Sequence, residues 1–323
     1  MTPPTMRDFL TIYRLQRQGV RLDLKGSLLY PTSPIYDATA SSLPGFWSDR
    51  VLTVVIREQG RSGFVQARWR GVLPVLDLLF IAPSLDTRHG TTWLWQRLVH
   101  ELVNVGAQSG AQRLFTQLPE KHHAEIEVMR QSGFAIYGQD RLYRLDKLPL
   151  LVKSGKRRWQ VRRSLDDWGL KRLYLALTPD VVQQAESVKL NGRNSYVGWC
   201  YNRHRKSFVL RGKLEGEVFA YLSLTRGKLA HWLKLVVHPE RVNQSSVLLE
   251  QALYMMRTWP EHPIYCDVRD YEGFLPDALE RVGFTRMMTR TLLVRHITAN
   301  IRVKATQRRL LLEAAPETAP SSF

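Results

Sequence analysis

The chain has 323 residues, of which 44% are hydrophobic and 24% are charged, a balance typical of a globular protein. Its 47 Lys and Arg against 29 Asp and Glu give a formal net charge of +18, which favours acidic small molecules or polyanions as partners. The N-terminus lacks the apolar core of a signal peptide, and the longest apolar run (residues 73–82) is too short to span a bilayer. We therefore expect a cytoplasmic protein without a membrane contact.

The first half of the chain alternates strand and helix signals. Residues 6–16 carry apolar side chains at helical spacing, whereas the Ser-, Pro- and Thr-rich segment 31–45 predicts a loop. Three β-branched runs between residues 51 and 82 predict an antiparallel meander. A helix, a strand and a second helix that ends at Gly133 follow, and a last strand closes the unit.

The second half repeats this order. A helix over residues 178–189 precedes three strands, a helix, a strand and a helix that ends at Gly283. A proline follows the third meander strand in both halves, at Pro83 and at Pro239. We expect a duplicated domain in which each copy has its own sheet and buries its own core. The expected units are residues 1–150, a basic linker 151–169, residues 170–299, and a tail 300–323 that is basic and then disordered.

The positive charge is densest in residues 153–163, between the two copies. One interpretation is a solvated connector, because a run of charge is more often solvated than used in recognition. The other is a contact with RNA or with the phosphates of coenzyme A, in which Trp159 stacks on a base. No RNA- or DNA-binding motif accompanies the segment.

This order of elements resembles the GNAT superfamily of acyl-CoA-dependent acyltransferases, over residues 50–145 and 170–296. The resemblance implies an α/β (α+β) fold with two domains, each a mixed, mostly antiparallel sheet flanked by helices. It also implies acetyl-CoA as cosubstrate and a small-molecule or peptide amine as acceptor. The acceptor itself and the oligomeric state are left open.

The family's most specific element is a Gln/Arg-x-x-Gly-x-Gly/Ala loop after the fourth strand, where small residues let backbone N–H groups reach the CoA pyrophosphate. In the first copy Gly90 fits the first small position, and Thr92 stands where Gly or Ala is usual. The residues that this match nominates for cofactor binding in the first loop are Arg88, His89, Gly90, Thr91 and Thr92.

The second loop contains no glycine, so the close backbone approach is lost there. Its nominated residues are Gln244, Ser245 and Ser246, whose hydroxyl and amide groups can meet an anion, together with Val237 at the end of the preceding strand. CoA binding is therefore expected more in the first copy than in the second. The alternative for both loops is a capped turn between strand and helix.

Catalytic residues are sparse. The resemblance implies that backbone N–H groups at Phe80 and Ile81 hold the acyl carbonyl oxygen. The family's proton-donating Tyr is matched by Met129 and Leu279, neither of which can transfer a proton.

Asp77 interrupts an apolar strand and is the candidate general base. The alternative is a structural pairing with Arg68 or Arg70. For Asp267, in the corresponding region of the second copy, we expect a structural pairing with Arg269 or Lys234.

Metal binding is not expected. His122, His123 and Glu125 lack a third ligand at fixed spacing, and Cys200 and Cys266 lack the spacing of a zinc site. Both cysteines are expected to be unpaired thiols.

The sequence thus favours a tandem GNAT-like N-acyltransferase that uses acetyl-CoA. Two alternatives stay open: a non-catalytic module of the same fold that binds acyl-CoA or nucleic acid, and a transferase that uses aminoacyl-tRNA, which the net charge of +18 would suit.

Overall fold

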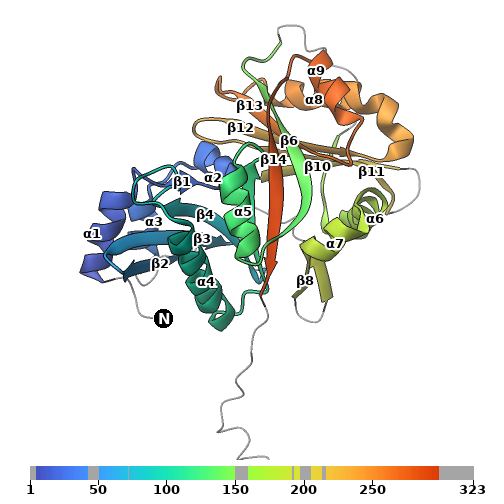
Figure 1. Ribbon diagram of the computed structural model, residues 1–323. Helices are drawn as coiled ribbons and strands as arrows, with labels where there is room; N and C mark the ends of the chain where they lie inside the picture. The colour runs from blue at the N-terminus through green and yellow to red at the C-terminus, as the bar shows by residue number, and fades with distance from the viewer. Residues whose placement is uncertain are drawn as a thin grey trace, which may run out of the picture.

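The computed structural model describes residues 5–42, 51–71, 73–149, 159–190, 193–196, 205–212 and 216–297 (Figure 1). The elements of the first half are α1 (Met6–Leu15), β1 (Val20–Arg21), α2 (Leu24–Leu29), α3 (Pro34–Ser42), β2 (Val51–Glu58), β3 (Arg61–Trp69), β4 (Val75–Ala82), α4 (Thr92–Gln108), β5 (Arg113–Pro119), α5 (His123–Gln131) and β6 (Ala135–Leu145).

The second half begins at β7. Its elements are β7 (Gln160–Val161), η1 (Ser164–Asp166), α6 (Asp167–Leu177), α7 (Asp180–Glu186), β8 (Ser187–Leu190), β9 (Arg193–Tyr196), β10 (Arg205–Arg211), β11 (Val218–Thr225), β12 (His231–Val237), η3 (Pro239–Gln244), α8 (Ser245–Met256), β13 (Ile264–Arg269), α9 (Leu275–Arg281) and β14 (Thr285–His296). In the part of the chain that the structure describes, no helix combines the length and the apolar character that crossing a membrane requires.

Two local expectations were wrong. The segment expected as a loop contains helix α3, in which Thr39 and Ser41 turn their hydroxyls back onto carbonyls of the preceding turn at 3.0 and 2.8 Å. These hydrogen bonds satisfy, within the helix, the same polar side chains that had suggested a loop. The helix expected over residues 178–189 ends at Glu186, and the chain continues as β8, which pairs with β9.

All the described strands except β8 and β9 form one continuous 12-stranded sheet in the order β2-β3-β4-β5-β14-β6-β13-β12-β11-β10-β7, with β1 paired to β4. The expected mixed sheet with flanking helices and the antiparallel meanders are confirmed. The expectation of two separate sheets was wrong, because the last strand of each half pairs with the other half: β14 lies beside β5, and β6 lies beside β13. Figure 1 shows β6 in green and β14 in red side by side at the centre of the molecule.

The two hydrophobic cores reflect this exchange. Helices α4 and α5 pack on the first half of the sheet, and the same cluster includes Leu293 and Ile297 from the C-terminal end of the described chain. Helices α8 and α9 pack on the second half, together with Tyr143 and Leu145 from β6. Each core therefore contains part of the other half, contrary to the expectation that each copy buries its own core.

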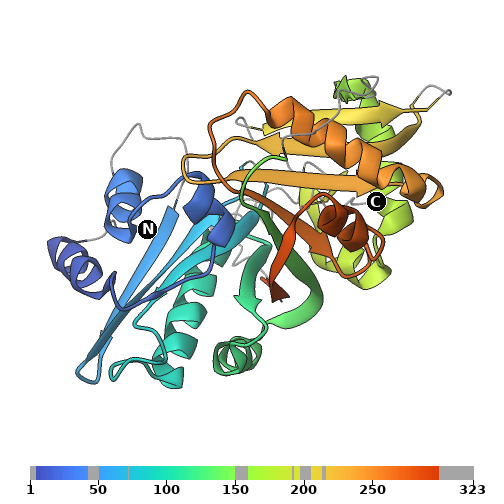
Figure 2. The same cartoon turned by 90° about the horizontal axis from the view of Figure 1, so that it is seen from above.

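Helices are exchanged as well. Leu29 of α2 packs with Trp232 and Tyr265 of β12 and β13, and its carbonyl accepts a 2.9 Å hydrogen bond from the Lys228 N–H. In return, Val182 of α7 packs in one cluster with residues of β4, β5 and β14. Figure 2 shows the short blue helix α2 beside the gold strands of the second half. Each half thus covers the parallel strand pair of the other.

The basic segment between the halves is partly described. Residues 153–158 and the tail 300–323 lie outside the described residues, and from Trp159 onward the chain forms β7, η1 and the start of α6. The Trp159 side chain is buried, and its indole N–H donates to the Leu248 carbonyl at 3.2 Å. The stacking role expected for Trp159 was therefore wrong, because this ring belongs to the second core. The unit boundaries themselves stay predictions.

Candidate functional site

Each half contains one pair of parallel strands that parts into a fork. In the first half β4 and β5 are paired from Val75 to Asp77 on β4, and in the second half β12 and β13 are paired from His231 to Leu233 on β12. Beyond these positions the strands diverge. A diverging strand leaves backbone N–H and C=O groups without a neighbouring strand, so the arms of a fork can bind an extended ligand.

The first fork is occupied by the chain itself. Strand β1 pairs with β4 so that Val20 faces Ile81, and the Leu22 N–H donates to the Leu79 carbonyl at 2.8 Å. Since backbone groups alternate between the two edges of a strand, those of Ile81 also face β1 and those of Phe80 face β3. Both positions are already paired within the sheet. The expected hold on an acyl oxygen does not fit this arrangement.

The loop before α4 is closed on itself. The Gly90 N–H donates to the Thr87 carbonyl at 2.9 Å, and a Cβ at Gly90 would come within 1.9 Å of the Ser84 carbonyl oxygen. Gly90 is thus required for a tight turn, and its N–H is not directed at a ligand. Thr91 caps α4 by accepting from the Leu94 N–H at 3.3 Å. Of the residues nominated in this loop, Arg88, His89 and Thr92 are exposed, as is the neighbouring Asp86.

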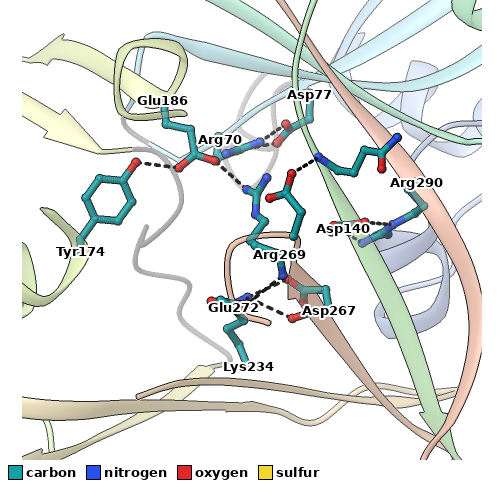
Figure 3. Close-up of polar contacts among 12 residues, drawn as sticks. Arg70, Asp77, Asp140, Tyr174, Glu186, Lys234, Asp267, Arg269, Glu272 and Arg290 are labelled. Carbon is teal, nitrogen blue, oxygen red and sulfur yellow. Dashed lines mark hydrogen bonds and ion pairs between the residues drawn. The ribbon is translucent and has the colours of Figure 1, made fainter. Parts of the chain in front are cut away.

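Asp77 lies at the apex of the first fork as a partner of Arg70. The Arg70 Nε donates to Asp77 Oδ2 at 2.8 Å, and a second guanidinium nitrogen donates to the other carboxylate oxygen (Figure 3). The same guanidinium lies 5.1 Å from the centre of the Phe115 ring. The structure thus places Asp77 in the structural pairing that was the alternative to a general base.

The second fork is open along β12. The His231 N–H donates to the Pro263 carbonyl, so the odd-numbered residues of β12 turn their backbone groups toward β13. Beyond Leu233, none of the described strands pairs with this edge. Leu235 donates its N–H to the Cys266 thiol, whereas the backbone of Val237 faces the fork. Of the nominated strand positions, Val237 is thus the one that the fold leaves available.

The N-terminus of α8 follows this arm. Residues Pro239–Gln244 form the 3-10 turn η3 that leads into Ser245 and Ser246. Ser245 is buried, and its hydroxyl has no hydrogen-bond partner among the described residues, whereas Ser246 is partly exposed. The first N–H groups of a helix lack intrahelical partners and attract anions. In α8 the Ser245 N–H is already used, because it donates to the Val242 carbonyl at the end of η3, so only the N–H groups after Ser245 could meet an anion.

A cavity of about 80 Å³ lies between the arms of the second fork. Residues of both halves line it: Lys25, Tyr174, Leu177, Thr178, Glu186, Arg205, Lys234, Val236, Asp267, Arg269, Tyr271 and Glu272. Four of these side chains are cationic and three are carboxylates. A cavity of this polarity is typical of a binding site for a charged group.

The carboxylates of the cavity are all engaged (Figure 3). Lys234 Nζ lies 2.9 Å from a Glu272 oxygen and 3.5 Å from an Asp267 oxygen. Asp267 also accepts from the Trp232 indole N–H. The expected pairing of Asp267 with Lys234 is confirmed.

A second pair continues the network toward α7. The Arg269 guanidinium lies 2.6 Å from a Glu186 oxygen, and the Tyr174 hydroxyl donates to the other Glu186 oxygen at 2.9 Å. Figure 3 shows Arg269 between Glu186 and the Asp267 cluster. One guanidinium nitrogen of Arg269, Nη1, is buried without a hydrogen-bond partner among the described residues.

These pairings set the charge states. Burial would raise the pKa of Asp267, but Lys234, Lys25 and Arg290 together lower it far below its usual range. Burial would lower the pKa of Lys234, but Glu272 and Asp267 outweigh it and raise that pKa. Both side chains are therefore charged at neutral pH.

Lys25 differs from the other cations. Burial lowers its pKa to about 8, and the attraction of Asp267 offsets only part of this effect. Its ammonium lies 4.8 Å from the centre of the Trp232 ring, and among the described residues it forms neither a salt bridge nor a hydrogen bond. It comes from α2 of the first half. Nothing in its local sequence signals this position, because every group around it is distant in the chain.

The remaining candidates are structural. His122 contacts Glu125 at 3.3 Å, and the described residues contain no group of three or more His, Cys, Asp or Glu side chains that could hold a metal ion. Cys266 is a free, buried thiol, and burial raises its pKa. Cys200 lies outside the described residues.

Three antiparallel strands, a forked pair of parallel strands and the helices between them occur twice in the chain, which is the order of elements expected from the resemblance to the GNAT superfamily. The chain is similar in structure to a tandem GNAT protein from the clavulanic acid biosynthesis pathway (16% identity, 82% of this chain and 88% of that one, TM-score 0.47). It is also similar to a GCN5-related N-acetyltransferase from Sphaerobacter thermophilus (12%, 92% and 95%, TM-score 0.49) and to Saccharomyces cerevisiae N-myristoyltransferase (10%, 92% and 77%, TM-score 0.43). No family model and no curated protein matches the chain.

Proposed function

We propose that the protein is an acyl-CoA-dependent N-acyltransferase that transfers the acetyl group of acetyl-CoA to an amine at the second fork. The observation that carries this proposal is the edge of β12 beyond Leu233, which pairs with no strand among the described residues, ends at Val237 and is followed by η3 and the N-terminus of α8. An extended pantetheine chain can pair with such an edge, while the helix end meets the pyrophosphate.

In this reaction the neutral amine attacks the thioester carbon. A C–N bond forms, the C–S bond breaks, and coenzyme A leaves as the thiol after taking up the proton that the amine loses. The Val237 N–H is the backbone donor that the fold leaves available for the acyl oxygen. Holding both reactants between the arms of the fork contributes to the rate without a dedicated acid.

The second fork is favoured over the first for two reasons. Strand β1 fills the edge of β4 that a pantetheine chain would need. The Gly90 N–H, expected to face a phosphate, is used inside its own turn. This reverses the ranking of the two copies that the loop sequences suggested.

Matched charge substitutions at the two helix N-termini test the location. Ser246 and Thr92 both lie in the first turn of the helix that follows a fork, on α8 and α4. Ser246→Glu places a carboxylate against the pyrophosphate and should weaken acetyl-CoA binding about ten-fold or more, equivalent to about 1.4 kcal/mol. Thr92→Glu should leave the affinity unchanged. Isothermal titration calorimetry with acetyl-CoA measures both.

The opposite ranking would move the site to the first half, and the absence of acetyl-CoA binding to the unmodified chain would refute the proposal. Turnover is measured separately as release of free thiol from acetyl-CoA with a panel of amines. Binding without thiol release above the blank would leave a module that binds acyl-CoA without catalysis.

A further inference from the structure

The cavity in the second fork is a shared construction of the two halves. Lys234 and Val236 come from one arm of the fork, and Asp267 and Arg269 from the other. Lys25 is the one lining residue from the first half, and it reaches the cavity because α2 packs over β12. The cavity therefore lies where an acceptor would approach a thioester on β12.

The charges in this cavity do not balance. The three carboxylates have hydrogen-bonded or ion-paired partners within the protein. Four cations face them, so one positive charge is in excess, and Lys25 is the cation without a salt bridge or hydrogen bond among the described residues. Burying a charge without a partner is unfavourable. An anion with a single negative charge would restore the balance.

Size and charge select the kind of anion. A cavity of about 80 Å³ has room for a small charged group. A phosphate monoester carries about −1.5 to −2 charges at neutral pH, more than the excess in the cavity. A carboxylate carries a single charge and fits both limits. Arg269, whose Nη1 is buried without a hydrogen-bond partner among the described residues, also lines this cavity.

We infer that this cavity binds a carboxylate through Lys25, and that the acceptor amine is a small molecule which also carries that carboxylate, such as an amino acid. The part of the inference that concerns the acceptor rests on the proposed acyl transfer, whereas the carboxylate site does not. With the carboxylate held at Lys25, the acceptor extends toward the open arm of β12. Lys25 is thus a binding residue that one half contributes to the site of the other.

The carboxylate site is tested without turnover, with acetate as the probe. Thermal unfolding is recorded in sodium acetate, sodium chloride and sodium sulfate at equal ionic strength. Acetate should raise the Tm of the unmodified protein above its value in chloride, and this difference should vanish in Lys25→Met and persist in Lys25→Arg. Lys228→Met is the matched control: it removes an exposed lysine at the same junction, and it should keep the acetate effect.

An acetate effect that persists in Lys25→Met, or a larger effect of sulfate than of acetate, would overturn the assignment. So would the absence of any acetate effect in the unmodified protein. The Lys25→Arg variant distinguishes loss of the charge from loss of folding, because it keeps the charge on a different side chain.

The acceptor class is tested with a pair of amines that differ mainly in the carboxylate. β-Alanine and propylamine both carry an amine on a three-carbon chain, which ends in a carboxylate in β-alanine and in a methyl group in propylamine. The kcat/KM for acetyl transfer should be at least ten-fold higher with β-alanine. Lys25→Met should abolish the preference. Equal rates in the unmodified protein would refute the acceptor class while leaving the transferase intact. If neither amine leads to thiol release but the acetate effect still depends on Lys25, the acceptor class is refuted and the carboxylate site is retained.

Discussion

Asp140 and Arg290 lie directly opposite each other on β6 and β14, and the guanidinium donates two hydrogen bonds of 2.8 and 2.7 Å to the carboxylate. Their side chains are only 3% and 5% exposed. Since β6 and β14 are the exchanged strands, this ion pair joins the two halves at the centre of the sheet.

Removal of one partner of this pair should be strongly destabilising. Arg290→Met leaves the Asp140 carboxylate buried without its counter-charge, so the free energy of unfolding should fall by about 3–5 kcal/mol. The double variant Asp140→Leu/Arg290→Met should lose less than Arg290→Met alone. Urea unfolding measures both, and a single variant as stable as the unmodified protein would contradict the expectation.

The stability of the protein should depend on pH through Lys25. The pKa of Lys25 is about 8 in the folded chain, against an ordinary value of 10.5 for lysine. Below pH 8 the folded and the unfolded chain both hold the proton, so the folded chain bears the full cost of burying the charge. Between these values the unfolded chain binds more protons, and stability therefore rises with pH. From pH 7 to pH 9 the unmodified protein should gain on the order of 1 kcal/mol relative to Lys25→Met.

This comparison isolates Lys25, because the groups that act on it are the same in both proteins: Asp267, Arg205, Lys234 and Arg290. Urea unfolding at the two pH values gives the difference. A constant gap between the two proteins would show that the Lys25 pKa is not lowered by folding.

Gly90 should matter for stability and not for acetyl-CoA. Gly90→Ala forces a methyl group against the Ser84 carbonyl, and overpacking of this kind costs about 1–3 kcal/mol. Gly273→Ala is the control, because a Cβ there meets nothing within 4 Å. Thermal unfolding should rank the two variants in this order, with acetyl-CoA affinity unchanged in both. A loss of affinity in Gly90→Ala at unchanged Tm would return the cofactor to the first half.

Asp77 should be dispensable for turnover. In Asp77→Asn the pair with Arg70 is weakened, and because both side chains are partly exposed, the loss of stability should be about 1 kcal/mol or less. Steady-state thiol release should retain the kcat of the unmodified protein. A drop in kcat at unchanged acetyl-CoA affinity would instead assign Asp77 a role in catalysis.

The sequence predicted the order of elements well, because that order depends on local signals such as the glycines at Gly133 and Gly283 and the β-branched runs of the meanders. It did not predict the exchange of β6 and β14. Strands β6 and β14 are the last strands of two equivalent units. The apolar pattern of each strand suits the sheet of either half, so only the long-range pairing decides which half each strand joins.

The residues of the proposed site differ in how far the sequence points to them. Val237 and the helix that begins at Ser245 could be found because they follow one strand along the chain. Lys25 could not, since its partners Trp232 and Asp267 are brought to it by the packing of α2 on the other half. Gly90 was misassigned because a glycine that closes a turn and one that approaches a ligand look the same in a sequence.

The exchanged strands also fix the order in which the molecule can be made. Strand β5 acquires its neighbour on one side only when β14, near the end of the chain, has left the ribosome. Until then the nascent first half exposes an open strand edge, a surface prone to pairing with other chains. The fold therefore completes only once β14 has been made, instead of half by half, and a ribosome that stops before β14 releases a chain in which neither half has its full sheet.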